Sequence, residues 1–136
     1  NHPLVSLTRL MEELGQYKMV DVLYDIFSED ELMQRTPLLA AAFLHSLGGA
    51  YHSGGNQTKA LKYYQDCLSI YLQFLAPNDP SLSPTYNNMG FVYVALKDYK
   101  NALVSQQAAL ECQLQSNQPR VDSIIVYYKN IASTQE

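Results

Sequence analysis

The stretch TYNNMGFVY, residues 85–93, decides how this chain should fold. Tyr86, Met89, Gly90 and Tyr93 recur at the spacing of one helical face. Two asparagines nevertheless sit side by side within the stretch, although the asparagine amide competes for backbone hydrogen bonds and disfavours helix. The stretch LHSLGGAY, residues 44–51, carries glycine and tyrosine at the same spacing 42 residues earlier. The pattern therefore indicates a repeated helix that uses its asparagines for something other than helix formation.

The 42-residue interval aligns a series of residue pairs along the chain. These are Gly48 with Gly90, Tyr51 with Tyr93, Ala60 with Ala102, Leu61 with Leu103, and Leu68 with Leu110. A second shift aligns Tyr86 with Tyr128 and Asn88 with Asn130, whereas the N-terminal residues fit more loosely at a shift near 40. Self-similarity of this length is typical of stacked repeats. We therefore expect one array with units at about 1–33, 36–77 and 79–118, followed by a half-unit at 119–136.

Each unit is predicted to be a hairpin of two helices, which makes the chain an all-α solenoid. The expected helices are 3–14, 17–29, 37–53, 57–75, 81–96, 99–115 and 119–134. Turns are expected at 53–56 and 96–98, and the proline-containing stretch 76–84 separates two units. A glycine inside a helix costs about 0.5–1 kcal/mol relative to alanine. We therefore expect paired helices to approach backbone to backbone where Gly48 meets Ala60 and Gly90 meets Ala102.

The composition narrows the possible functions. The 136 residues are 47% hydrophobic with a net charge of −4, which argues against disorder and against binding the nucleic-acid backbone. No apolar run is long enough for a membrane helix. Cys67 and Cys112 form no disulfide framework, and we expect reduced thiols in a cytoplasmic protein. Because the chain begins with Asn1, we expect a processed chain or a piece of a longer one.

The chain resembles the tetratricopeptide repeat family. The resemblance rests on two runs of residues: Leu44-Leu47-Gly48-Tyr51-Ala60-Tyr64-Cys67 and Tyr86-Met89-Gly90-Tyr93-Ala102-Ala109. The interval of 42 and the junction NDPSLSPTYNNMGFVY are similar to the kinesin-light-chain type of this family. The resemblance implies a right-handed superhelix whose first helices line a concave groove that holds an extended peptide. In the family, asparagines at the position of Asn88 commonly contact the peptide backbone.

Helical geometry places Asn88 on the side of its helix away from the hairpin partner. The same register in the other units predicts a groove lined mainly by neutral polar side chains. The candidate groove residues are Asn88, Asn130, Asn87, Lys129, His45, Ser46, Arg9, Ser6, His52 and Phe91. A side-chain amide offers donors and an acceptor, so it can pair with the backbone of any extended peptide. Alternatively, Asn87 and Asn88 bond to a neighbouring helix, and Phe91 packs between repeats.

Other chemistry is not supported by the sequence. One subset of the family grips a C-terminal carboxylate with lysine, arginine and asparagine, but here His45, Gly49 and Val126 stand at positions of that clamp. His45 and His52 have no third metal ligand nearby in sequence, although they could make binding pH-dependent. No nucleophile–base pair or phosphate loop is present, so we expect neither an enzyme nor a cofactor.

Two functions remain. In the first, the chain is an adaptor whose groove binds an extended segment of another protein. In the second, it is a structural or self-association scaffold within a larger multidomain protein, which can include an enzyme domain. The second function draws on the last helix, whose apolar residues have no second helix to cover them. These are Val121, Ile124, Ile125, Tyr127, Tyr128 and Ile131. A homodimer, or further repeats, could pack on this face.

Overall fold

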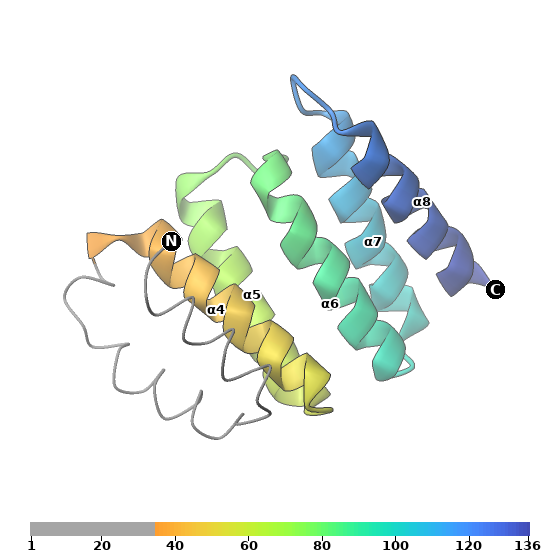
Figure 1. Ribbon diagram of the computed structural model, residues 1–136, viewed down its shortest axis with the longest axis horizontal. Coiled ribbons are helices and arrows are strands. Elements are labelled where there is room, and N and C mark those ends of the chain that lie inside the picture. The colour runs from red at the N-terminus through yellow and green to blue at the C-terminus, as the bar shows by residue number, and fades with distance from the viewer. Residues whose placement is uncertain (1–34) are drawn as a thin grey trace. The chain divides into compact units, whose positions relative to one another are not determined.

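The computed structural model of the protein describes residues 35–136, which belong to two compact parts, Asn1–Phe74 and Leu75–Glu136. Figure 1 shows the helices of each part. All regular structure within residues 35–136 is helical, which confirms the predicted all-α fold. The helices expected at 3–14 and 17–29 lie outside the described residues.

The described residues of the N-terminal part form one helical hairpin. Helix α4 spans Pro37–Ser53 and helix α5 spans Gln57–Phe74, within one residue of the predicted bounds. Proline suits the first turn of α4 because the N–H that it lacks would have no partner within the helix. The side chain of Asn56 caps α5 by accepting a hydrogen bond from the backbone N–H of Lys59 at 3.2 Å.

The C-terminal part contains a short 3₁₀ helix and three α-helices. They are η1 (Pro80–Leu82), α6 (Ser83–Ala95), α7 (Tyr99–Leu114) and α8 (Val121–Gln135). Helix α7 lies between α6 and α8 and packs against both (Figure 1). Helix α6 begins at Ser83 rather than at the expected residue 81 because η1 precedes it, with the Asp79 side chain accepting from the N–H of Ser81 at 2.8 Å.

The two hairpin turns repeat one another bond by bond at the 42-residue interval. Gly54, Gly55 and Asn56 donate their N–H groups to Ala50, His52 and Tyr51, and Leu96, Lys97 and Asp98 donate to Val92, Val94 and Tyr93. Both turns need a residue with positive φ. Gly55 supplies it at 85°, whereas Lys97 adopts 62° despite its side chain. The capping residue that follows is also equivalent, because Asp98 accepts from the N–H of Asn101 at 3.2 Å.

The contact at the two helix glycines differs from the one expected. We predicted a backbone-to-backbone approach to Ala60 and Ala102, but a side chain lies on each glycine instead. A Cβ atom added to Gly48 would stand 2.7 Å from the Tyr64 ring, and one added to Gly90 would stand 2.7 Å from Cγ of Gln106. Tyr64 and Gln106 are themselves 42 residues apart. In each hairpin, the glycine therefore contacts a large residue of the second helix. This residue follows the repeated alanine, Ala60 or Ala102, by about one helical turn.

The two large residues are not equivalent in chemistry. Tyr64 is buried, and its ring meets the ring of His45 edge-on at 5.3 Å between centroids. Gln106 is 1% exposed, and its Oε1 has no hydrogen-bond partner. A buried polar atom without a partner destabilises the folded state. The C-terminal part therefore contains a local energetic defect where the N-terminal part has an aromatic ring.

Both cysteine side chains are buried and neither forms a disulfide. Their burial is consistent with the role as core thiols that we expect for Cys67 and Cys112. Burial is the main cause that raises the pKa of the Cys112 thiol. Among residues 35–136, no helix combines the length and hydrophobicity needed to cross a bilayer.

Candidate functional site

A pocket of about 280 Å³ lies on the C-terminal part, between α6 and α8. Helix α6 contributes Pro84, Asn87 and Asn88, and helix α8 contributes Asp122, Ser123, Val126 and Tyr127. The sequence predicted that both asparagines line a groove, and both line this pocket. Five of its seven lining residues carry amide, carboxylate or hydroxyl groups, so the pocket suits a polar ligand with hydrogen-bond donors and acceptors.

Asn130 of α8 reaches α6 through a direct hydrogen bond. Its Nδ2 donates to Oδ1 of Asn87 at 2.8 Å. Thr134 in turn donates its hydroxyl to the backbone oxygen of Asn130 at 2.9 Å. For Asn87, the structure thus supports the alternative in which a helix asparagine bonds to a neighbouring helix. The bond joins the two helices that line the pocket and holds their amides in place.

The remaining predicted residues of the C-terminal part lie on exposed surface. Lys129 stands on α8 seven residues after Asp122, so both project from the same face of the helix about two turns apart. Phe91 of α6 is also exposed, but it does not line the pocket. Residue Tyr127 closes the pocket from the inside, and burial raises the pKa of its hydroxyl.

In the N-terminal part, the three predicted residues of α4 have partners within their own hairpin. The hydroxyl of Ser46 donates to the backbone oxygen of Ala42 at 3.2 Å. His52 Nδ1 lies 2.6 Å from Oε1 of Gln57, across the turn to α5. His45 is half-buried beside Tyr64, and desolvation by burial lowers its pKa. Ser6 and Arg9, the other two predictions, lie outside the described residues.

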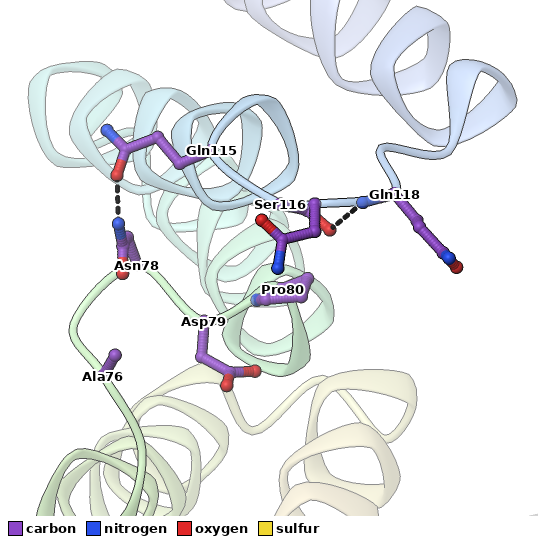
Figure 2. Close-up of a pocket in the computed structure, with 8 residues that line it drawn as sticks. Ala76, Asn78, Asp79, Pro80, Gln115, Ser116 and Gln118 are labelled. Carbon is purple, nitrogen blue, oxygen red and sulfur yellow. Dashed lines mark hydrogen bonds between the residues drawn. The ribbon is translucent and has the colours of Figure 1, made fainter.

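A second pocket, of about 480 Å³, lies between the loops that precede α6 and α8 (Figure 2). Sequence reasoning missed it, because its residues come from loops that only the packing of α7 brings together. Amide and other small polar side chains dominate its lining: Ala76, Asn78, Asp79, Pro80, Gln115, Ser116, Asn117 and Gln118.

The polar groups of this second pocket mainly join the loops to each other. The Nδ2 of Asn78 donates to Oε1 of Gln115, as Figure 2 shows. The carboxylate of Asp79 accepts from the N–H of Ser81, and the hydroxyl of Ser116 accepts from the N–H of Gln118 at 3.2 Å. These groups are therefore already paired within the chain, and the bond between Asn78 and Gln115 fixes the two loops to each other.

The outer face of α8 is apolar. Val121, Ile125 and Tyr128 are 68%, 48% and 55% exposed and follow one another at the spacing of one helical stripe. Tyr127 is buried, and Ile124 and Ile131 are half-buried. The expectation that all six apolar residues of this helix lack cover is therefore wrong for these three, because α8 packs against α7. Among residues 35–136, no group of three or more histidine, cysteine, aspartate or glutamate side chains could hold a metal ion.

Helix hairpins that repeat at 42 residues, with matching turns and matching glycine contacts, define a helical-repeat protein. The tetratricopeptide repeat family model matches residues 38–115, and the chain belongs to this family. Such repeats are generally protein–protein interaction modules. No curated protein matches the chain. Its assignment to the kinesin-light-chain type stays a prediction.

Proposed function

We propose that this chain is an interaction module, not an enzyme, that binds an extended segment of a partner protein in the groove expected of its family. The pocket between α6 and α8 is the described part of this site. The observation that carries the proposal is that α6 and α8, both first helices of their repeats, line one pocket to which α6 presents Asn87 and Asn88. Both cysteines are buried and neither forms a disulfide, so we expect the module to act in the cytoplasm.

Two features support binding of a peptide backbone here. The pocket is open to solvent and lies along two helices, so a chain can pass through it without entering a closed cavity. The hydrogen bond from Asn130 fixes Oδ1 of Asn87, so the amide of Asn87 is oriented before any ligand arrives. Lys129 and Phe91 flank this surface in our proposal. His45, Ser46, His52, Ser6 and Arg9 stay our candidates for peptide contact in the other repeats.

The test is the Asn88→Ala variant, screened with the unchanged chain against an array of short synthetic peptides. Loss of one or two amide hydrogen bonds should weaken binding about 3- to 10-fold, since each contributes roughly 0.5–1.5 kcal/mol. Thermal unfolding should be nearly unchanged, because Asn88 is at the surface of the pocket and not in the core.

Gln107→Ala is the matched control, because it removes an exposed amide from α7 that lines neither pocket. Peptides should bind this variant as they bind the unchanged chain. Loss of thermal stability with intact binding in Asn88→Ala would assign Asn88 to packing and reject the site.

The alternative function is self-association or scaffolding through the apolar stripe of α8. Ala132, on the same stripe as Ile125 and Tyr128, stands 42 residues after Gly90, which faces α7 in its own hairpin. The stripe is thus the surface on which a second helix packs in the preceding repeat. A second copy or further repeats would bury it.

Sedimentation across protein concentration distinguishes the two functions. Scaffolding by self-association predicts a dimer that Ile125→Glu abolishes, with Lys129→Glu as a control that places the same charge outside the stripe. A chain that stays monomeric at all concentrations would count against the alternative and leave the interaction module.

A further inference from the structure

The lining of the α6–α8 pocket carries a negative formal charge and no positive one. Of its seven lining residues, Asp122 alone carries a formal charge at neutral pH. The others supply two amides, two hydroxyls and apolar surface. A ligand group that enters this pocket therefore meets one carboxylate and several hydrogen-bond acceptors, but no lining cation.

Asp122 remains available to a ligand. Its only described ion pair joins Oδ2 to Nη2 of Arg120 at 3.4 Å, and the two side chains are 74% and 72% exposed. Exposed ion pairs of this kind are weak, because water screens them and ordering two side chains costs entropy. A cation of the ligand can replace Arg120 or share the carboxylate with it.

An anionic ligand group is the competing possibility, since the N-terminus of α8 carries a partial positive charge. Asp122 stands in the first turn of α8 and already compensates that charge. A second anion there would be repelled by its carboxylate. Lys129, the nearest cation further along this face, is seven residues and about 10 Å away at the usual helical rise. The end of the pocket at Asp122 therefore favours a cation over an anion.

The remaining surface fits the long stem of a basic side chain. Pro84 and Val126 are exposed apolar residues of the lining, and the methylene groups of arginine or lysine pack well on such surface while their charged head stays polar. Arginine suits the acceptors better than lysine, because its planar guanidinium donates several hydrogen bonds in fixed directions.

We propose that the pocket binds an arginine or lysine side chain of the partner's extended segment, with Asp122 as the residue that recognises its charge. This inference rests on the proposed function, since it names the ligand residue that the peptide site selects.

The experiment uses the full chain and four pools of capped nine-residue peptides, with the central residue set to arginine, lysine, glutamine or glutamate and all others randomised. Binding is compared by fluorescence polarisation at low and high salt. We expect the arginine pool to bind roughly 3- to 10-fold better than the glutamine pool, the glutamate pool to bind most weakly, and the difference to shrink at high salt.

Two variants test the role of Asp122. Asp122→Asn should remove the preference for arginine and lysine, and Asp122→Lys should reverse it in favour of glutamate. The charge-removing variant Asp98→Asn, in the turn before α7, is the control and should keep the preference for basic peptides.

Each outcome decides a different claim. If no pool binds, both the proposed peptide site and this inference are rejected. If peptides bind without a preference for a basic residue, or if Asp122→Asn keeps that preference, the inference is overturned while the peptide site stands. A preference for basic residues that Asp122→Lys reverses supports both.

Discussion

Replacing Gln106 with methionine should stabilise the protein, which is unusual for a substitution at a buried helix position. Gln106 lies under Gly90, and its buried Oε1 accepts no hydrogen bond. Leaving such a group unsatisfied costs about 1–3 kcal/mol. Methionine keeps the unbranched length and the Cγ atom that rests on Gly90, but it has no oxygen to desolvate. It therefore preserves the packing and removes the penalty.

We expect Gln106→Met to raise the free energy of unfolding by about 1–2 kcal/mol. For a chain of this size, that corresponds to a rise of roughly 3–10 °C in Tm. Urea unfolding should show a higher midpoint with an unchanged slope, because the amount of surface exposed on unfolding stays the same.

Gln113→Met is the matched control on the same helix. Gln113 is also buried, but its Oε1 accepts a hydrogen bond from the backbone N–H of Arg120 at 3.3 Å. Removing that acceptor leaves an N–H unpaired, and the variant should lose about 0.5–1.5 kcal/mol. If Gln106→Met loses as much stability as Gln113→Met, then Oε1 of Gln106 has a partner and the reasoning is refuted.

Three further predictions concern the repeated features. Gly48→Ala should lower the free energy of unfolding by about 1–3 kcal/mol in urea titrations, because the new Cβ would meet three atoms of the Tyr64 ring within 3 Å. Gly90→Ala should lower it less, because its Cβ would come within 3 Å of only one atom, Cγ of the flexible Gln106 side chain. An equal loss in both variants would contradict this account. Lys97→Gly should stabilise the chain by about 0.5–1 kcal/mol, because glycine adopts a positive φ without strain. Gly55→Ala should destabilise the chain through backbone strain alone, because the added Cβ would touch nothing. A lower Tm in Lys97→Gly would show that the contacts of the lysine side chain outweigh its backbone strain. Because burial lowers the pKa of His45 below its usual 6.5, the folded state prefers the neutral ring, so its contribution to stability is present above about pH 6.5 and is lost as the pH falls below it. Urea unfolding at pH 7.5 and 5.5 should show this loss of stability in the unchanged chain and a smaller loss in His45→Phe. Equal losses in both would mean that other groups cause the pH dependence of stability.

The periodicity of the sequence was enough to predict the local structure of residues 35–136. The spacing of Gly48, Tyr51 and their counterparts places one apolar stripe on each helix, and that stripe selects helix over strand. Proline, glycine and capping residues then set where the helices begin and end, because each changes which backbone groups can be paired. These are short-range effects, so the helices from α4 to α8 were predicted almost residue by residue.

Which side chains meet was decided by the tertiary structure. The sequence correctly marked Gly48 and Gly90 as sites of close approach, but the approaching groups are Tyr64 and Gln106, not the backbone at Ala60 and Ala102. Likewise, the sequence aligned Asn130 with Asn88, whereas its hydrogen bond goes to Asn87. Side chains lean toward the N-terminus of their helix and neighbouring helices are offset along their axes. The angular position of a residue on one helix therefore follows from its own sequence, but its partner on the next helix depends on how the two helices are packed.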